Sequence, residues 1–160
     1  MDNYFCADNL YRVWDSVTVD FSFAAAKGTM TVIVGKSGSG KSTVLRLIAG
    51  LEEPNRRNDG KECTVRLDGK TITKTAPGKR GIGMVFQSHA LFSHLTVTEN
   101  VAYGLRSRGM GKKEAEAEAE KYIAEFALAG FGKRMPETLS GGEAQRVSLA
   151  RTLIVKPPLV

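Results

Sequence analysis

The chain has 160 residues, which is enough for one domain with a hydrophobic core. No apolar run approaches the roughly 20 residues of a membrane-spanning helix, and residues 1–4 lack the basic and apolar regions of a signal peptide, so we expect a cytoplasmic protein. The net charge of +6 arises from basic residues scattered along the chain, which favours a solvated surface over binding to nucleic acid.

The N-terminal part of the chain has a β pattern over residues 4–34. Apolar and polar residues alternate over 17–23, which predicts a strand with one buried face. Lys27 and Gly28 mark a turn, and the apolar run at 31–34 predicts a buried strand directly before a glycine-rich loop.

The glycine-rich loop at 35–43 fits the pattern G-x-x-x-x-G-K-[ST] at every fixed position. Glycines let the backbone wrap an anion without Cβ clashes, and successive N–H groups then point into one concavity. Lys41 supplies a mobile positive charge for the outer phosphates, and the Ser42 hydroxyl is placed to bind Mg²⁺. Residues 44–49 predict a helix that ends at Gly50, and its N-terminal dipole favours the same anion. Strand, loop and helix together predict a site for nucleotide phosphates.

Between this helix and Gln87, the pattern predicts a surface loop and two further strands. Residues 52–62 are polar and rich in turn formers, as is typical of a loop. Residues 63–67 predict a strand that ends at an Asp-Gly turn. Residues 81–86 predict another buried strand, which ends at Gln87.

The second half of the chain has a helical pattern. Thr96 and Glu99 have the spacing of a capping box, which predicts a helix over residues 97 to about 105. Residues 112–129 predict an amphipathic helix with one apolar face. That face comprises Ala115, Ala119, Tyr122, Ile123 and Phe126 and indicates core packing.

Residues 139–151 read LSGGEAQRVSLAR, and Ser140 with Glu143 forms a second capping box that predicts a helix to about residue 155. This stretch resembles the signature motif of the ATP-binding cassette (ABC) ATPases, whose usual form is LSGGQ. Together with the phosphate loop and residues 85–87, Val-Phe-Gln, it makes three motifs of that family in the expected order. Residues 90–101 are also similar to the region after the Q-loop in importer-type cassettes.

The resemblance extends from about residue 5 to residue 160 and implies a fold. We expect an α/β protein with a P-loop NTPase core of the ABC type, built of mostly parallel strands. An antiparallel β subdomain would come from the N-terminal third, and a helical subdomain would span about 88–140. Residues 1–160 would form one partial nucleotide-binding domain that lacks the C-terminal part of the family's domain.

The resemblance also implies a role for each motif residue. Lys41 would hold the β and γ phosphates, Ser42 would bind Mg²⁺, and Gln87 would contact Mg²⁺ or the attacking water. Lys41 and Gln87 are therefore the catalytic candidates within the chain. The rest of the phosphate cradle would comprise Gly35, Ser37, Gly38, Ser39, Gly40 and Thr43. Trp14 aligns best with the aromatic residue that stacks on adenine, and Tyr11 is the alternative.

The signature residues Ser140, Gly141 and Gly142 would act across a dimer, where they cap the γ-phosphate held by the other subunit's phosphate loop. Ser140 also fits a plain helix N-cap, and both roles are compatible. Glu143 stands where the family usually has glutamine. Its carboxylate would weaken nucleotide contact modestly, or would be neutral if it points back to the cap.

The implied function is that of the ATP-binding subunit of an ABC importer, which couples ATP binding and hydrolysis to solute uptake. ATP and Mg²⁺ would be its cofactors. Its partners would be a second nucleotide-binding subunit in a homodimer, a transmembrane permease and, indirectly, a solute-binding protein, but no nucleic acid. It would lie in the cytoplasm at the inner face of the cell membrane. Among importers, the sequence is most similar to the cassettes of thiamine importers, and those of sulfate/iron-type importers are nearly as similar.

In the family, the second acidic Mg²⁺ motif and the catalytic glutamate follow the position of Val160, so no residue here fills the general-base position. His89 and His94 follow the Q-loop directly, so neither fits the switch histidine. We therefore expect the 160 residues alone to bind nucleotide weakly, to hydrolyse it poorly and to expose apolar surface. The alternatives are a non-transport ABC ATPase and a nonhydrolytic nucleotide-binding fragment. A single cassette with a short interval between Q-loop and signature favours transport.

Overall fold

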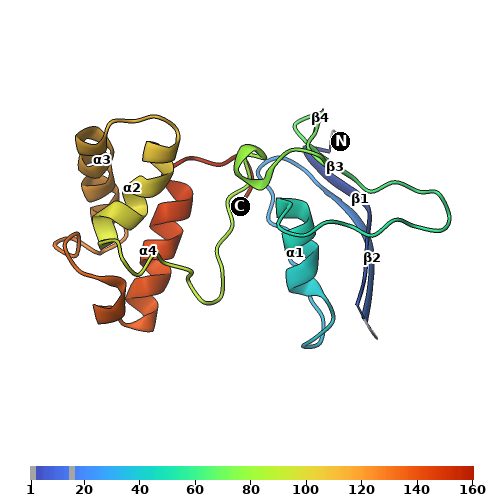
Figure 1. The fold of residues 1–160 in the computed structure, drawn as a ribbon, viewed down its shortest axis with the longest axis horizontal. Helices are drawn as coiled ribbons and strands as arrows, with labels where there is room; N and C mark the ends of the chain where they lie inside the picture. Colours follow the sequence, from blue (N-terminus) through green and yellow to red (C-terminus); the bar gives the residue numbers. More distant parts are fainter. Residues whose placement is uncertain (1–2, 15–16) are drawn as a thin grey trace. The chain divides into compact units, whose positions relative to one another are not determined.

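The computed structural model describes residues 3–14 and 17–160, which divide into two compact units, Met1–Gly81 and Ile82–Val160 (Figure 1). The first unit is an antiparallel sheet with one helix, and the second is helical. Among the described residues, no helix is both long enough and apolar enough to cross a membrane.

The sheet of the first unit has the strand order β2-β1-β3-β4, and every neighbouring pair is antiparallel. Its strands are β1 (Phe5–Trp14), β2 (Val17–Ala25), β3 (Thr64–Leu67) and β4 (Lys70–Thr71). The predicted strand at 17–23 is confirmed, with Val19 buried and its polar neighbours exposed. The predicted Asp-Gly turn is also confirmed, since Asp68 and Gly69 both have positive φ, as a tight hairpin requires.

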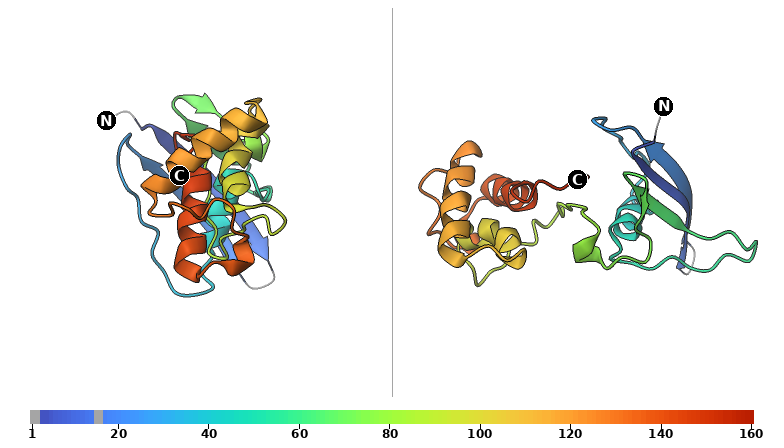
Figure 2. Two further views of the ribbon diagram at one scale, coloured as in Figure 1. Left: turned by 90° about the vertical axis from the view of Figure 1, so that its left-hand side faces the viewer. Right: turned by 90° about the horizontal axis from the view of Figure 1, so that it is seen from above.

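Helix α1 (Lys41–Ala49) lies beside the sheet (Figure 2) and contacts β1 and β2. Its buried residues include Val44, Leu47 and Ile48. It begins and ends at glycines in the left-handed region, Gly40 (φ 87°) and Gly50 (φ 75°). The helix predicted after the glycine-rich loop is thereby confirmed, with its predicted end. Residues 52–62 form no helix or strand, in agreement with the predicted loop.

The strands predicted at 31–34 and 81–86 are not formed, and these two predictions were wrong for the structure as described. In the second unit, Ile82 makes one isolated parallel bridge with Leu159. Three apolar residues next to the loop are exposed: Met30 (91%), Val32 (71%) and Val34 (83%). A parallel strand needs neighbours that accept its backbone hydrogen bonds, and within the described residues sheet pairing is confined to β1–β4 and that one bridge. The predicted core of mostly parallel strands is therefore not present there.

The second unit contains three helices around one core (Figures 1 and 2). They are α2 (Val97–Ser107), α3 (Lys112–Glu125) and α4 (Gly141–Leu153). The second unit also contains a short 3₁₀ helix, η2 (Pro136–Thr138), and another, η1 (Pro77–Lys79), lies in the first unit. Both predicted capping boxes are confirmed, at Thr96 and at Ser140. The predicted apolar stripe of α3 is confirmed at its centre, where Ala115, Ala119 and Ile123 are fully buried.

Two helices end earlier than predicted. Helix α3 ends at Glu125 because Ala127 takes a positive φ of 55°, which turns the chain back so that Leu128 joins the core. Helix α4 ends at Leu153, and Lys156 with φ 48° leads into the proline pair. The bounds of a helical subdomain at about 88–140 stay a prediction.

Candidate nucleotide-binding site

The glycine-rich loop has the backbone that its sequence requires. Gly38 and Gly40 have φ values of 81° and 87°, which side-chain-bearing residues rarely adopt. A Cβ on Gly40 would also overlap the side chain of Val19 on β2. The loop therefore closes against the sheet only with glycine at this position.

The Lys41 ammonium lies across this loop. Its Nζ donates to the carbonyl oxygens of Gly35 (2.9 Å) and Lys36 (2.8 Å). The Ser39 backbone N–H donates to the Lys36 oxygen at 3.2 Å and closes the turn. Ser42 is exposed in the first turn of α1, so its hydroxyl is available to a cation beside bound phosphates.

The N-terminus of α1 differs from those of α2 and α4. No side chain caps α1, and its first turn carries no acidic residue. Helices α2 and α4 each satisfy two of their N-terminal N–H groups, at N-cap and N3, with a capping box that includes a glutamate. The first N–H groups of α1 therefore remain available to an external anion, and no carboxylate of its own repels one.

The register of β1 and β2 separates the two aromatic candidates. Arg12 pairs with Val19, Trp14 with Val17, and Tyr11 with Asp20. Directly paired residues of an antiparallel ladder point to the same face, and residues two apart on one strand share that face. Because Val19 contacts the loop at Gly40, Trp14 lies on the face toward the loop and Tyr11 on the opposite face.

Arginines stack on both aromatic rings. The guanidinium of Arg12 lies 5.4 Å from the centroid of the half-buried Trp14 ring. The guanidinium of Arg57 lies 4.9 Å from the Tyr11 ring and also pairs with Asp20 at 2.7 Å. Tyr11 therefore belongs to a charged surface cluster remote from the loop face.

Gln87 and the signature residues belong to the second unit, whereas the loop and Trp14 belong to the first. Gln87 is exposed. The chain after it turns sharply, because His89 and Ala90 have φ values of 62° and 47°. Their carbonyl oxygens accept hydrogen bonds from α4, from Ser148 Oγ (2.9 Å, His89) and from Arg151 Nη1 (2.7 Å, Ala90).

At the signature, Ser140 and Glu143 satisfy each other. The Glu143 carboxylate accepts from the Ser140 backbone N–H at 2.6 Å, and Ser140 Oγ accepts from the Glu143 N–H at 3.4 Å. The Ser140 N–H holds the pKa of the Glu143 carboxyl below its ordinary value. The carboxylate thus points back to the cap, the orientation in which we expect it to be neutral for nucleotide contact.

The two glycines of the signature are not required by the packing of this chain. A Cβ on Gly141 would meet nothing within 4 Å, and one on Gly142 would meet only the Arg146 guanidinium, at 3.8 Å. Neither glycine has a positive φ. The absence of side chains here therefore leaves the N-terminus of α4 open to the close approach of another group.

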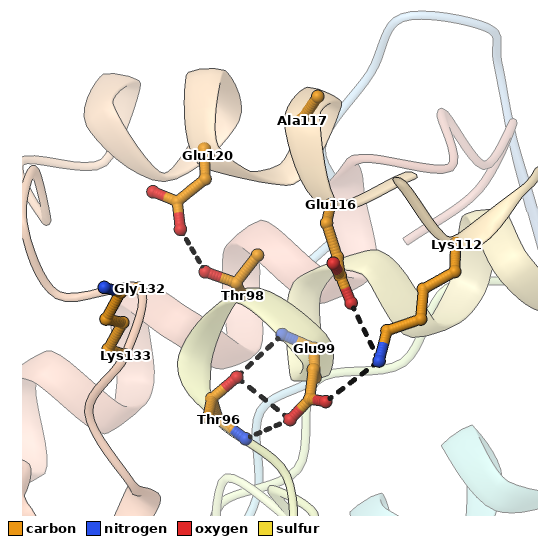
Figure 3. A pocket seen from close by; sticks show the side chains of 9 residues that line it. All are labelled: Thr96, Thr98, Glu99, Lys112, Glu116, Ala117, Glu120, Gly132 and Lys133. Atoms are coloured by element: carbon orange, nitrogen blue, oxygen red, sulfur yellow. Dashed lines mark hydrogen bonds and ion pairs between the residues drawn. The ribbon is translucent and has the colours of Figure 1, made fainter. Parts of the chain in front are cut away.

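A pocket of about 410 Å³ lies between α2 and α3 (Figure 3). Four of its charged groups have partners, as the dashed lines in Figure 3 show: Glu99 closes the capping box of α2, Lys112 lies 3.6 Å from Glu116, and Glu120 accepts from Thr98 Oγ. Within the part of the chain that the structure describes, no three His, Cys, Asp or Glu residues are grouped as metal ligands.

Residues 18–160 match the family model described as ABC transporter. The chain belongs to the ABC transporter family. It is 43% identical over 155 residues to the sulfate/thiosulfate import ATP-binding protein CysA of Mycobacterium tuberculosis, covering 96% of this chain and 42% of that protein. It is 45% identical over 141 residues to the Fe(3+) ions import ATP-binding protein FbpC of Rhizobium etli, covering 88% of this chain and 38% of that protein. The chain therefore spans less than half the length of these curated relatives.

These matches confirm the resemblance to ABC importer subunits. The relatives named here are a sulfate/thiosulfate and an Fe(3+) import protein, as the sequence similarity to sulfate/iron-type importers predicts. The motifs of the ABC chain did not reveal three polar residues that hold its loops: Arg80, Asn100 and Arg151. Arg80 is 8% exposed and Asn100 is fully buried. Their types alone predict surface positions, and Asn100 and Arg151 lie within predicted helices, so the sequence carried no signal for these contacts.

Proposed function

We propose that this chain is the ATP-binding part of the ATPase subunit of an ABC importer. The observation that carries the proposal is the uncapped N-terminus of α1, preceded by a loop that glycines wrap and Lys41 crosses. This arrangement offers backbone donors, a helix dipole and a mobile cation to one polyanion. Gly35, Ser37, Gly38, Ser39, Gly40 and Thr43 would complete the cradle, and Mg²⁺ would be held by Ser42 and Gln87 with the phosphates.

Trp14 is the better candidate for the base-stacking residue. Its ring lies on the sheet face that contacts the loop, whereas Tyr11 lies on the opposite face beneath Arg57. An aromatic face is suited to adenine because stacking buries apolar area without a strict geometric requirement.

We infer that a second subunit completes the site. The exposed glycines Gly141 and Gly142, with Ser140 ahead of them, would receive the γ-phosphate held by the partner's loop. The retracted position of Glu143 supports this, because its charge is directed to its own cap instead of toward an approaching anion. Because each phosphate loop would be completed by the signature residues of the other subunit, two copies of this chain would form a homodimer with two such sites.

The permease is the proposed membrane partner, contacted through the residues that follow Gln87. Their fixed, sharply turned backbone supports this role, because a segment that transmits motion must be firmly attached to a helix. The subunit would lie at the inner face of the membrane, and a solute-binding protein would act indirectly.

The names of the relatives suggest sulfate, thiosulfate or Fe(3+) as the transported solute. Thiamine remains a further prediction from the sequence. The same names favour a transport ATPase over a non-transport ABC ATPase.

The test is ATP titration of the chain and its Lys41→Met variant in the presence of Mg²⁺. Removing the ammonium should weaken ATP binding roughly tenfold or more, since it removes a charge-assisted contact to phosphate. Lys36→Met is the matched control, because Lys36 lies in the same loop, is exposed and occupies a variable position of the motif. Equal affinity of Lys41→Met and the unmodified chain would contradict the proposal.

An ATPase assay on the same samples separates an enzyme from a nonhydrolytic binder. Hydrolysis needs a group that orients water and an acidic partner for Mg²⁺. Among the described residues, no three His, Cys, Asp or Glu side chains are grouped so that they could hold a metal ion. We therefore expect ATP binding by the 160 residues with little turnover, and turnover at an ordinary enzymatic rate would contradict this part of the proposal.

A further inference from the structure

Arg80 is a buried arginine that lies outside every motif considered so far. Its side chain is 8% exposed, and burial lowers the pKa of its guanidinium from the ordinary value. The guanidinium donates to four backbone carbonyl oxygens: Leu47 (3.2 Å), Ile48 (2.7 Å), Thr73 (2.6 Å) and Thr75 (2.8 Å). A buried cation with this many partners is fixed in one geometry.

Two of the four acceptors lie in the last turn of α1. Arg80 Nη1 donates to the carbonyl oxygens of Leu47 and Ile48, of which Leu47 also accepts from the Gly50 N–H at 3.1 Å, and it places a positive charge at the negative end of the helix dipole. Gly50, the C-cap of α1, has a φ of 75°, and a Cβ there would overlap the Arg80 guanidinium. Gly50 and Arg80 are thus a matched pair.

The other two acceptors hold the helix to a different segment. Thr73 and Thr75 follow β4, so Arg80 links the end of α1 to the chain that leaves the sheet. Helix α1 has nine residues, too few to be stable in isolation, so tertiary contacts must fix its position. At its other end, Gly40 rests against Val19.

We propose that Arg80 is a positioning residue for the phosphate loop. A helix of nine residues is a rigid rod about 13 Å long, so a shift at its C-terminus displaces Lys41 and Ser42 at its N-terminus. Arg80 prevents that shift. The ligand is the ATP of the proposed function, so the ATP-binding measurement described below rests on that proposed function.

The test compares Arg80→Met with the unmodified chain in two measurements. The first is hydrogen exchange of the α1 amides without nucleotide, and the second is an ATP titration that yields both Kd and the number of sites. We expect faster exchange in α1, unchanged exchange in α4, and a Kd weaker by about tenfold at an unchanged number of sites. Arg66→Met is the matched control, because Arg66 is an exposed arginine of the same unit, paired with Asp8 at 2.9 Å.

Two further variants keep the test decisive. Arg80→Lys retains the charge but cannot span four carbonyls, so its Kd for ATP should lie between those of the unmodified chain and of Arg80→Met. If Arg80→Met does not fold, Arg80→Lys decides the question. Gly50→Ala should weaken ATP binding in the same way, and its effect should not add to that of Arg80→Met, because both disturb one contact.

Several results would overturn the inference: unchanged α1 exchange in Arg80→Met, a reduced number of sites at unchanged Kd, or Arg80→Lys identical to the unmodified chain in both measurements. A reduced number of sites would indicate a role in folding alone. If the unmodified chain does not bind ATP, the proposed function fails, and the exchange in α1 alone then decides whether Arg80 holds the helix.

Discussion

At the N-termini of α1, α2 and α4, single side chains decide how the first backbone N–H groups are satisfied. Glu99 and Glu143 each accept a hydrogen bond from the N-cap backbone, and those N–H groups lower the pKa of both carboxyls. Helix α1 has neither a cap nor an acidic residue in its first turn. A capping box thus satisfies part of the N-terminal N–H groups of α2 and α4, whereas no side chain does so at α1.

The capping carboxylates predict a pH dependence of stability. A carboxyl whose pKa is lower in the folded chain stabilises the fold above its ordinary pKa of 4.5, and this contribution is lost as the pH falls through the folded value. We expect the midpoint temperature of thermal unfolding to decrease as the pH is lowered below about 4.5, and to decrease less steeply in Glu143→Gln. The check is a series of thermal melts from about pH 7 to about pH 3.

Glu125→Gln is the control for this series, because Glu125 is an exposed carboxyl at the opposite end of a helix. It should leave the pH profile close to that of the unmodified chain. Identical profiles for Glu143→Gln and the unmodified chain would show that the Glu143 cap makes no titratable contribution.

At the scale of elements, the segment after Gln87 is held by two helices of its own unit. From α2, the buried Asn100 side chain accepts from the Phe92 N–H at 2.8 Å and donates to the Phe92 carbonyl oxygen at 3.0 Å. From α4, Arg151 donates to Ala90 and its guanidinium lies 5.3 Å from the Phe92 ring. The segment is therefore irregular in secondary structure but fixed in position.

Asn100→Ala tests the attachment to α2. The substitution leaves a buried N–H and several carbonyl oxygens at 92, 95 and 96 without their partner, which should lower the free energy of unfolding by about 3 kcal/mol. Urea unfolding measures the loss. Ser107→Ala, at the exposed end of the same helix, should change stability by less than about 0.5 kcal/mol. A loss for Asn100→Ala as small as that of the control would show that water replaces the amide.

At the scale of the whole molecule, each unit has its own core, and the apolar run before the phosphate loop belongs to neither. Phe5, Leu10 and Val65 are buried in the first unit, and Val101 and Ile123 in the second. The run at 30–34 instead leaves large apolar side chains exposed. An exposed, unpaired stretch of β-forming residues is an aggregation site.

We therefore expect the chain to self-associate through residues 30–34. The double substitution Val32→Thr with Val34→Thr keeps β-branched side chains but lowers their hydrophobicity, so it should reduce aggregation at equal concentration. Static light scattering during incubation measures the difference. Val13→Thr with Val17→Thr is the control, since those exposed valines lie on paired strands. Equal scattering from all three proteins would exclude this run as the cause.

Local sequence chemistry was sufficient for features that depend on neighbours in the chain. The capping boxes at Thr96 and Ser140, the turn at Asp68 and Gly69, and the glycine that ends α1 were all predicted, because their hydrogen bonds and φ values are set within a few residues. The phosphate loop belongs to the same class, since its glycine spacing alone defines its backbone.

By itself, the sequence determined the family and the order of the helices, and it supplied the candidate residues of the proposed site. Only the tertiary structure decided that 31–34 and 81–86 lack strand partners, because a strand is completed by chain far away in sequence. It also placed Trp14 and Tyr11 on opposite faces through the register of β1 and β2, and buried Arg80 against the end of α1. Pairing register and burial of a charge depend on contacts between distant segments, which residue types and local spacing do not specify.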